Sequence, residues 1–277
     1  MDLNFWQEFT QQHPECEKYQ GKYKGSVIVL KAGGEVIESE FLDSFLYDTA
    51  MLRNLEAKPV LVYGAKKSIN SALERAGIQD MGRVEGNRVT SEEMIQVIDD
   101  VQKEITGKII SFLRKYGAGA EEGFMYAKQW IPKSGEYAGF VGEPTDVDAK
   151  IRELMESGLI PVISFIGISH NGQKCNINAD YVACVAAPQL EARSLLYLTD
   201  VEGVFDSQGK LMKELTGEDT EKMIESGIIK GGMMPKVTYA LKAKGMGVEA
   251  VHIINGKQEH SVLLELLTDS GIGTMIR

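Results

Sequence analysis

Short apolar runs alternate with longer segments of helical spacing along this chain. The apolar runs are rich in Val, Ile and Leu and predict buried strands, which cover residues 26–31, 59–64, 159–167, 194–201 and 248–256. Between these runs, apolar residues recur every three or four positions and predict amphipathic helices over 39–58, 67–77 and 90–117. This alternation indicates a mainly parallel sheet covered by helices, which is the α/β class.

Local signals mark where some of these elements begin and end. Thr90, followed three residues later by Glu93, has the pattern of a capping box and predicts the start of the long helix. Gly77 predicts the end of the helix over 67–77. The segment 118–143 mixes glycines with aromatic residues and predicts a hairpin or a loop.

The composition narrows the class of protein. Of the 277 residues, 43% are hydrophobic and 25% are charged, which is typical of a globular protein with one large α/β domain or two smaller ones. The formal net charge of −10 argues against a general binder of nucleic acid or of anionic membranes. A local cationic pocket for a small anion is still compatible with this charge, so we expect a small-molecule partner and neither nucleic acid nor membrane.

The cysteines and the N-terminal residues bear on location. Cys16, Cys175 and Cys184 are odd in number and lack the spacing of metal ligands, so we expect reduced thiols and no metal bound by the protein alone. Residues 1–20 have no basic segment followed by an apolar one, and no apolar run approaches the roughly 18 residues of a membrane span. These features predict a cytoplasmic protein.

The end of the first predicted strand carries a lysine and a pair of glycines. Ligands of α/β sheets bind at the carboxyl ends of the strands, which is where Lys31, Gly33 and Gly34 would lie. Glycine lets backbone N–H groups approach phosphate oxygens, and a lysine supplies a positive charge. The alternative interpretation is an ordinary turn between a strand and a helix.

Two later stretches have residues of the same kind. Asn176, Asn178 and Asp180 alternate before a helix of small residues, where they fit either a ligand site or a turn with a helix cap. Gly232 and Lys236 lie at the start of another helix, which fits either an anion site or a routine helix start. Neither the G-x-x-x-x-G-K-[ST] nor the G-x-G-x-x-G pattern is present, and the four histidines suggest no nucleophilic triad.

Six short motifs follow one another in a definite order. They are Lys-x-Gly-Gly after the first strand, Arg-Val-Thr before the long helix, then NINAD, LTDVEGV, GGMMPKV and, at the end, HSVLLELLTDSGIGTMI. Single motifs are modest signals, but this order closely resembles the amino acid kinase family, over nearly the whole chain from residue 25 onward. Within the family, the chain is most similar to members that phosphorylate N-acetyl-L-glutamate and are inhibited by arginine.

The resemblance implies a fold and a division of the chain. The fold is a three-layer αβα sandwich on a mainly parallel sheet of about eight strands. Residues 1–24 would form an N-terminal helix or extension, 25–190 a lobe that binds the amino-acid substrate, and 191–277 a lobe that binds the nucleotide.

The implied reaction moves the γ-phosphoryl group of ATP onto the side-chain carboxylate of N-acetyl-L-glutamate, which is the second step of arginine biosynthesis. This carboxylate is already ionised at neutral pH and needs no general base. Catalysis must instead hold two anions together and neutralise the charge on the transferring group. Mg²⁺ would be held mainly by the nucleotide.

Family motifs assign roles to individual residues. Lys31 and Lys236 would flank the transferring phosphoryl group, and Asp180 would orient both lysines. The substrate would be bound by Gly64, Ala65, Arg88 and Asn176, with the Arg88 guanidinium clamping its α-carboxylate. The nucleotide would be bound by Gly33, Gly34, Thr199, Asp200, Gly203, Gly232 and Met233.

The chain departs from the family pattern in two places. The family has His-Gly-Gly-Gly-Pro after the second strand, whereas this chain has Tyr63, Gly64, Ala65, Lys66 and Lys67. The added Cβ atoms crowd the site unless φ stays negative, and the two lysines either contribute charge or are solvated. The family's Leu-Ser-Gly-Lys-Asp-Gly is replaced by GAEEG at 119–123.

Arginine-inhibited members of the family share an N-terminal helix and the C-terminal motif. Here the corresponding residues are Tyr19, His260, Glu265 and Gly271, together with an apolar N-terminal set of Leu3, Phe5, Trp6 and Phe9. The resemblance implies a homo-oligomer, either a dimer or a hexamer built by interlaced N-terminal helices, with L-arginine bound between that helix and the C-terminal stretch. The alternative is a terminal helix that packs on its own subunit.

Three other functions compete with this one. The chain could be a carbamate, aspartate or glutamate kinase of the same family, or a catalytically weak relative that binds an amino acid and regulates. It could also be the kinase-like domain of an N-acetylglutamate synthase, but the chain ends at Arg277 and we expect no acetyltransferase domain.

Overall fold

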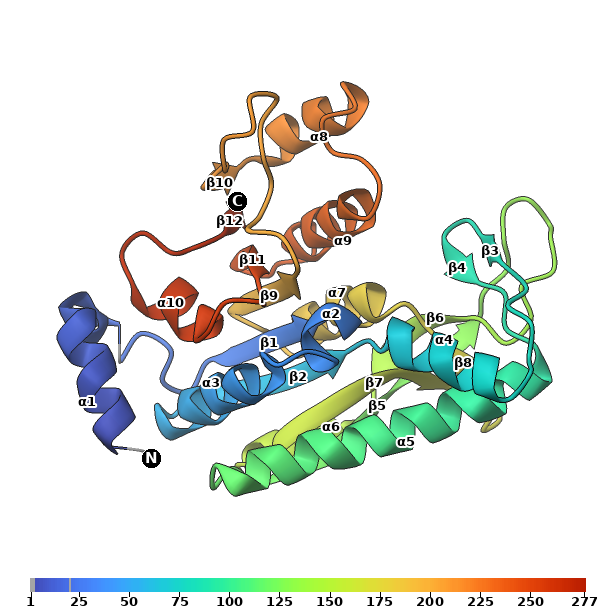
Figure 1. Cartoon of the computed structure of the whole chain (residues 1–277), viewed down its shortest axis with the longest axis horizontal. Coiled ribbons are helices and arrows are strands. Elements are labelled where there is room, and N and C mark those ends of the chain that lie inside the picture. Colours follow the sequence, from blue (N-terminus) through green and yellow to red (C-terminus); the bar gives the residue numbers. More distant parts are fainter. Residues whose placement is uncertain (1–2, 20) are drawn as a thin grey trace.

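Helices and strands alternate along most of the chain, as the hydrophobic pattern predicts (Figure 1). The structure, a computed structural model, describes residues 3–19 and 21–277, with side chains from residue 5 onward in those ranges. The side chain of Leu3, part of the predicted apolar N-terminal set, therefore lies outside the described residues.

The strands and helices have the following bounds. The strands are β1 (Val27–Ala32), β2 (Lys58–Tyr63), β3 (Arg83–Val84), β4 (Asn87–Arg88), β5 (Ala120–Gln129), β6 (Gly142–Val147), β7 (Ile160–Ile168), β8 (Lys174–Asn176), β9 (Ser194–Thr199), β10 (Glu214–Leu215), β11 (Ala250–Asn255) and β12 (Thr274–Ile276). The helices are α1 (Leu3–Gln12), the short η1 (Pro14–Lys18), α2 (Gly34–Ile37), α3 (Leu42–Asn54), α4 (Lys66–Arg75), α5 (Glu92–Lys115), α6 (Ala149–Glu156), α7 (Ala179–Gln189), α8 (Gly217–Glu225), α9 (Met233–Gly245) and α10 (Ser261–Leu267).

The central sheet has ten strands within the described residues. Its order is β10-β12-β11-β9-β1-β2-β7-β5-β6, and β8 pairs with β7. From β11 through β5 all neighbours are parallel. Strand β12 is antiparallel to β11 and parallel to β10, while β6 and β8 are antiparallel to β5 and β7. The predicted mainly parallel α/β fold is confirmed, and the strands beyond the expected eight or so include short ones such as β8 and β10.

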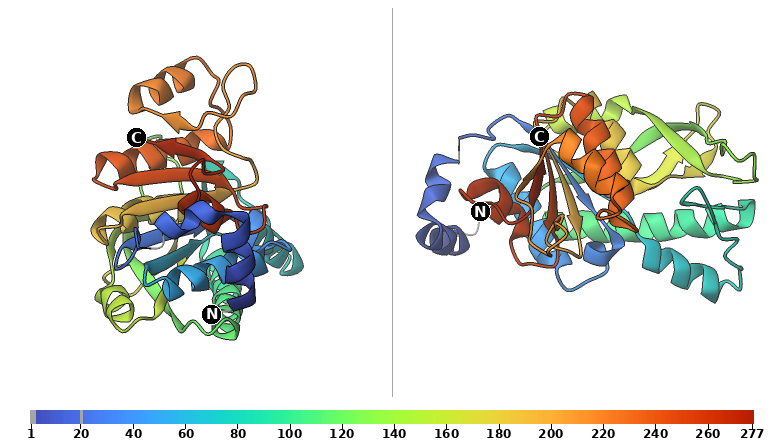
Figure 2. Two further views of the ribbon diagram at one scale, coloured as in Figure 1. Left: turned by 90° about the vertical axis from the view of Figure 1, so that its left-hand side faces the viewer. Right: turned by 90° about the horizontal axis from the view of Figure 1, so that it is seen from above.

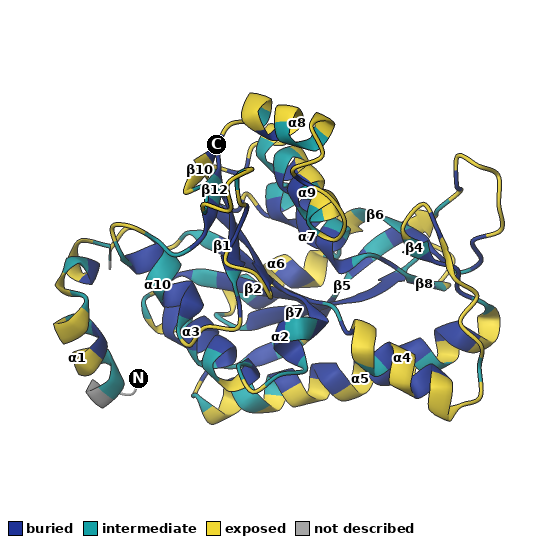
Figure 3. Ribbon diagram, turned by 45° about the horizontal axis from the view of Figure 1, so that its top comes forward, coloured by how far each residue is buried: buried dark blue, intermediate teal, exposed yellow. Residues whose placement is uncertain are grey.

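Side chains of each central strand alternate between two apolar layers. In β1, Ile28 and Leu30 enter one layer with α2, α3, α4, α5 and α10, while Val29 enters the other with α6, α7 and α9. Helices therefore cover both faces of the sheet (Figure 2), and the strands between them are buried while the outer helix faces are exposed (Figure 3). The three layers follow because successive residues of a strand point to opposite faces of the sheet, and helices pack on both faces.

The sheet is continuous across the predicted lobe boundary near residue 190. Strand β1 pairs in parallel with β2 on one side and with β9 on the other. Both apolar layers also contain residues from either side of that boundary. The division into two lobes stays a prediction.

The predicted start of the long helix was wrong, and the segment 118–143 takes part in a hairpin. The N-cap of α5 is Ser91, whose side chain accepts a hydrogen bond from the Met94 amide, so the prediction of Thr90 as the cap was wrong. Thr90 is fully buried and instead donates its hydroxyl to the Arg88 carbonyl. The segment 118–143 contains β5, which forms a hairpin with β6, as one of the two predicted options required.

The N-terminal segment packs on its own chain. Phe9 is 5% exposed, and the Phe5 ring lies 4.7 Å from the Tyr47 ring and 4.3 Å from the His260 ring. Helix α1 thereby lies beside α3 and α10 at one end of the molecule (Figure 1). Among the described residues, no helix is long and apolar enough to cross a membrane.

Candidate active site

A buried carboxylate joins two lysines at the carboxyl end of β1. Lys31 follows Val29 on the sheet face that α7 covers, because alternate residues of a strand share a face. Asp180 lies in the first turn of α7, where the Asn178 side chain caps the helix by accepting from the Asp180 amide at 2.9 Å. The Lys31 Nζ lies 2.7 Å from Asp180 Oδ1, and Lys236 Nζ of α9 lies 3.6 Å from Asp180 Oδ2.

The carboxylate of Asp180 stays ionised although it is buried. The side chains of Lys31, Asp180 and Lys236 are 5%, 11% and 17% exposed. Burial alone would raise the pKa of Asp180, but attraction to Lys31 and then to Lys236 outweighs it and holds the pKa below its usual value. Two ammonium groups around one carboxylate leave a net positive charge that faces the pocket.

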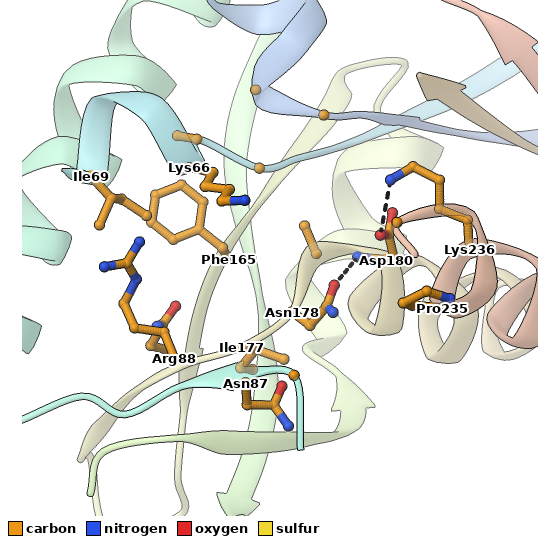
Figure 4. Close-up of a pocket in the computed structure, with 18 of the residues that line it drawn as sticks. Lys66, Ile69, Asn87, Arg88, Phe165, Ile177, Asn178, Asp180, Pro235 and Lys236 are labelled. Carbon is orange, nitrogen blue, oxygen red and sulfur yellow. Dashed lines mark hydrogen bonds and ion pairs between the residues drawn. The ribbon is translucent and has the colours of Figure 1, made fainter. Parts of the chain in front are cut away.

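The triad lies in the wall of a cavity of 350 Å³. Figure 4 shows Asp180 and Lys236 in this wall. The charged residues of this wall are Lys31, Glu35, Lys66, Arg83, Arg88, Asp180 and Lys236. Five cations against two carboxylates give the wall a formal charge of +3, although the whole chain carries −10. The cavity is therefore suited to binding anions.

The far side of the cavity combines Arg88 with apolar side chains. Arg88 is 6% exposed; it donates to Asp80 Oδ2 at 2.5 Å and also to Asn70 Oδ1. Burial lowers the pKa of Arg88, and the nearby Asp80 carboxylate opposes this shift. Ile69 and Phe165 line the cavity beside Arg88, so a charged end and a hydrocarbon surface lie together (Figure 4).

Asn176 reaches the same cavity from β8. Its Nδ2 donates to the Thr90 hydroxyl at 3.1 Å, and its backbone amide donates to the Phe140 carbonyl at 2.8 Å. The residues Asn176, Asn178 and Asp180 all line the cavity, which favours the ligand-site interpretation of this stretch while Asn178 also serves as a cap.

The glycines after β1 let two loops approach each other. A Cβ on Gly33 would lie 2.4 Å from Glu35 Oε2, and a Cβ on Gly34 would lie 3.1 Å from the Lys66 amide nitrogen. Gly64 and Ala65 line the cavity from the loop after β2. Ala65 has a negative φ of −142°, so it does not adopt the left-handed conformation that would favour glycine at this position.

The residues expected to bind the nucleotide are divided between the cavity and its surroundings. Gly33, Gly34 and Gly232 line the cavity. The other four are not part of that lining: Thr199 ends β9, Asp200 follows it, Gly203 packs against Thr274, and Met233 begins α9. The Gly33 amide donates to the Leu198 carbonyl at 3.4 Å, which joins the β1 and β9 ends of this region.

The residues expected to bind arginine are only partly together. The Tyr19 hydroxyl donates to Asp269 Oδ1 at 2.7 Å, so the N-terminal segment touches the C-terminal one. Glu265 Oε2 accepts from the Ile272 and Gly273 amides at 2.6 and 2.9 Å, close to Gly271.

The two histidines of this region have separate partners. His260 contacts Asp48 at 2.7 Å, while the histidine that contacts Glu265, also at 2.7 Å, is His252 of β11. Burial would raise the pKa of Glu265, but His252 and the two amides lower it. His252 was not among the predicted site residues, and its one signal in the sequence is that it is a polar residue inside an otherwise apolar strand.

Several other cavity residues were also missed. Glu35, Ile69 and Phe165 line the cavity but belong to none of the six motifs, and Ile177 lies inside the NINAD motif without an assigned role. Glu35, directly after the glycine pair, and Ile177, between Asn176 and Asn178, stand where the sequence could have indicated them. Among the described residues, no group of three or more His, Cys, Asp or Glu side chains is placed to hold a metal ion.

The fold and the lysine–carboxylate triad define a class, and comparison with known proteins agrees. The model of the amino acid kinase family matches residues 26–255, and the chain belongs to this family. The acetylglutamate kinase of Polynucleobacter asymbioticus is 38% identical over 95% of this chain and 92% of the relative. That of Bartonella tribocorum is 40% identical over 93% of this chain and 91% of the relative.

Solved structures of known proteins have the same fold as this chain. An N-acetylglutamate synthase from Neisseria gonorrhoeae, complexed with coenzyme A and N-acetyl-glutamate, has a TM-score of 0.87 and 25% identity to this chain. The match covers 95% of this chain and 62% of the synthase, so the chain spans less than two thirds of that protein. A carbamate kinase from Giardia lamblia, at 14% identity and a TM-score of 0.67, shares the fold.

Proposed function

We propose that this chain is an ATP-dependent kinase that phosphorylates the side-chain carboxylate of N-acetyl-L-glutamate. The observation that carries the proposal is the Lys31–Asp180–Lys236 triad in the wall of a cationic cavity. The full-length similarity to acetylglutamate kinases at 35–40% identity supports this substrate over carbamate, aspartate or free glutamate.

The geometry suits phosphoryl transfer without a general base. The substrate carboxylate is ionised at neutral pH, so the protein has only to align it with ATP and neutralise the charge that moves. Lys31 and Lys236 supply this charge, while Asp180 holds both ammonium groups toward one point. Asp180 is not the base, because its depressed pKa and its two lysine partners make it a weak proton acceptor.

The rest of the cavity fits the two substrates. The α-carboxylate would pair with Arg88, the hydrocarbon chain would lie along Ile69 and Phe165, and Asn176 would donate to the substrate. ATP would approach from the side of Gly33, Gly34 and Gly232, with Thr199, Asp200, Gly203 and Met233 beyond them. Mg²⁺ would enter as part of the nucleotide substrate and neutralise phosphate charge.

Trapping of the product tests this function. The purified chain is incubated with ATP, Mg²⁺ and N-acetyl-L-glutamate, and hydroxylamine converts an acyl phosphate into a hydroxamate that is identified by mass. We expect the hydroxamate of N-acetylglutamate. ATP hydrolysis without any hydroxamate would contradict the proposal.

The cellular setting and control are also proposed. The reaction would be the second step of arginine biosynthesis, in the cytoplasm, carried out by a homo-oligomer. L-arginine would inhibit by binding between the N-terminal segment and the C-terminal stretch. The contact between Tyr19 and Asp269 supports communication between these segments, and Glu265 and Gly271 lie close together on the C-terminal side.

A further inference from the structure

Helix α4 begins with an unusual distribution of charge. Its first two residues are Lys66 and Lys67, its first turn has no acidic residue, and its N-cap Ala65 has no side chain that can cap. The positive end of the helix dipole disfavours cations and favours anions. One carboxylate of the chain, that of Glu38, accepts from the Ser68 amide in this first turn, so the two lysines leave the start of α4 with a formal excess of one positive charge.

The two lysines line different cavities. Lys66 lines the active-site cavity together with Lys31 and Lys236, whereas Lys67 lines a separate cavity with Glu38 and Glu104. Both are exposed. In Figure 4, Lys66 extends from α4 toward the side where Asp180 and Lys236 lie, while Arg88 is on the opposite side.

The backbone of this loop is partly used by the protein itself. The Gly64 amide donates to the Ala32 carbonyl at 3.0 Å, and the Ser68 amide donates to Glu38 Oε1 at 2.6 Å. Amides that are bonded within the chain cannot donate to a bound phosphate. A lysine side chain beside them can supply the positive charge in their place. The Lys66 backbone also adjoins Gly34, which begins α2 directly after the strand that carries Lys31.

We infer that Lys66 is a third catalytic lysine, which contacts the transferring phosphoryl group where the chain lacks a glycine-rich loop, while Lys67 has no part in the reaction. The inference rests on the proposed function for the identity of the reaction. It requires only that a phosphoryl group passes between the triad and the start of α4.

Matched variants of the two lysines test the inference. Lys66→Ala and Lys67→Ala remove the same charge from the same helix turn, so their effects through the helix dipole are similar, while only Lys66 lines the active-site cavity. We expect Lys66→Ala to lower kcat by at least about tenfold with a smaller change in the KM for ATP, and Lys67→Ala to stay within about twofold. Lys66→Arg keeps the charge and should recover part of the loss, and Lys66→Met, which keeps the aliphatic stem, should not.

A binding measurement separates the inference from the proposed function. The probe is Mg-ADP with aluminium fluoride, a mimic of the phosphoryl group in flight, titrated calorimetrically into each variant. We expect Lys66→Ala to bind it about tenfold more weakly than Lys67→Ala. Equal binding and equal turnover of the two variants would overturn the role of Lys66. If the unaltered chain fails to phosphorylate N-acetyl-L-glutamate and the binding difference persists, the proposed substrate is wrong and the role of Lys66 stands.

Discussion

Asp180 determines how the two lysines of the site behave. A carboxylate in a buried place would normally take up a proton at a higher pH, but here two opposite charges within 4 Å reverse the direction of the pKa shift. The carboxylate therefore stays ionised and can hold Lys31 and Lys236 at fixed positions. The positive charge of the two lysines would therefore face the place where negative charge develops on the transferring phosphoryl group during the reaction.

Removing either lysine should lower the rate far more than it lowers binding. We expect Lys31→Ala and Lys236→Ala each to reduce kcat by about 100-fold to 1,000-fold, which corresponds to the loss of one preorganised charge from a water-poor site. Steady-state kinetics and nucleotide binding by calorimetry measure the two effects. Turnover near that of the unaltered chain in both variants would contradict the role of the two lysines.

The depressed pKa of Asp180 makes a prediction about stability and pH. A group with a lowered folded-state pKa contributes its stabilisation fully above the unfolded-state pKa of about 3.9 and loses it as the pH falls further. The difference in free energy of unfolding between the unaltered chain and Asp180→Asn should therefore be the same at pH 7 and pH 5. Below about pH 4 the free energy of unfolding of the unaltered chain should decrease relative to that of Asp180→Asn. Urea unfolding at each pH measures it, and a change between pH 7 and pH 5 would show that burial outweighs the lysines.

Two adjacent hydroxyl residues at the start of α5 have different tasks. Ser91 caps the helix, whereas the Thr90 hydroxyl donates to the Arg88 carbonyl and accepts from Asn176. Thr90 therefore links two residues of the proposed substrate site, and the helix itself depends on Ser91. The sequence pattern could not separate these tasks, because either residue is a good N-cap and only the tertiary contacts decide.

Variants of these two residues should separate stability from binding. Ser91→Ala should lower the free energy of unfolding by about 1 kcal/mol and leave the KM for N-acetyl-L-glutamate unchanged. Thr90→Val should raise that KM, because Asn176 loses its acceptor. Urea unfolding and steady-state kinetics measure the two effects. The same stability loss with no KM change in both variants would contradict the division of tasks.

The central strands and the triad were the parts most open to prediction. Apolar runs without polar interruption indicate buried parallel strands, and Lys31 at the end of such a run is expected at the carboxyl end of its strand, where ligands bind. The resemblance then supplied Asp180 and Lys236, which lie far apart in sequence. Residues such as Ile69 and Phe165 could not be predicted as part of the site, because an apolar residue that lines a cavity has the same pattern as one in the core.

Contacts between the two ends of the chain were the hardest to predict. The resemblance placed His260 and Glu265 in one arginine site, yet the side-chain partner of Glu265 is His252 and that of His260 is Asp48. These pairings depend on how β11, α10 and α3 lie together in the whole molecule. The contact of Tyr19 with Asp269 spans 250 residues and has no local signal.

The proposed control by L-arginine depends on the whole assembly. We expect light scattering to show a homo-oligomer larger than a dimer, and L-arginine to raise the concentration of N-acetyl-L-glutamate needed for half saturation. Tyr19→Phe removes the hydrogen bond to Asp269 and should weaken this inhibition without changing the uninhibited rate. A dimer whose kinetics ignore millimolar arginine would refute the regulatory proposal while leaving the catalytic one intact.

The central claim is that this cationic cavity serves phosphoryl transfer to N-acetyl-L-glutamate. The most direct measurement is kcat/KM from ADP release with Mg-ATP and, in parallel, N-acetyl-L-glutamate, L-glutamate, L-aspartate and carbamate, with Lys31→Ala as the control for contaminating activity. We predict the highest kcat/KM for N-acetyl-L-glutamate and loss of that activity in the control. Turnover of carbamate or free glutamate with none of N-acetyl-L-glutamate, or equal turnover by Lys31→Ala, would contradict the account.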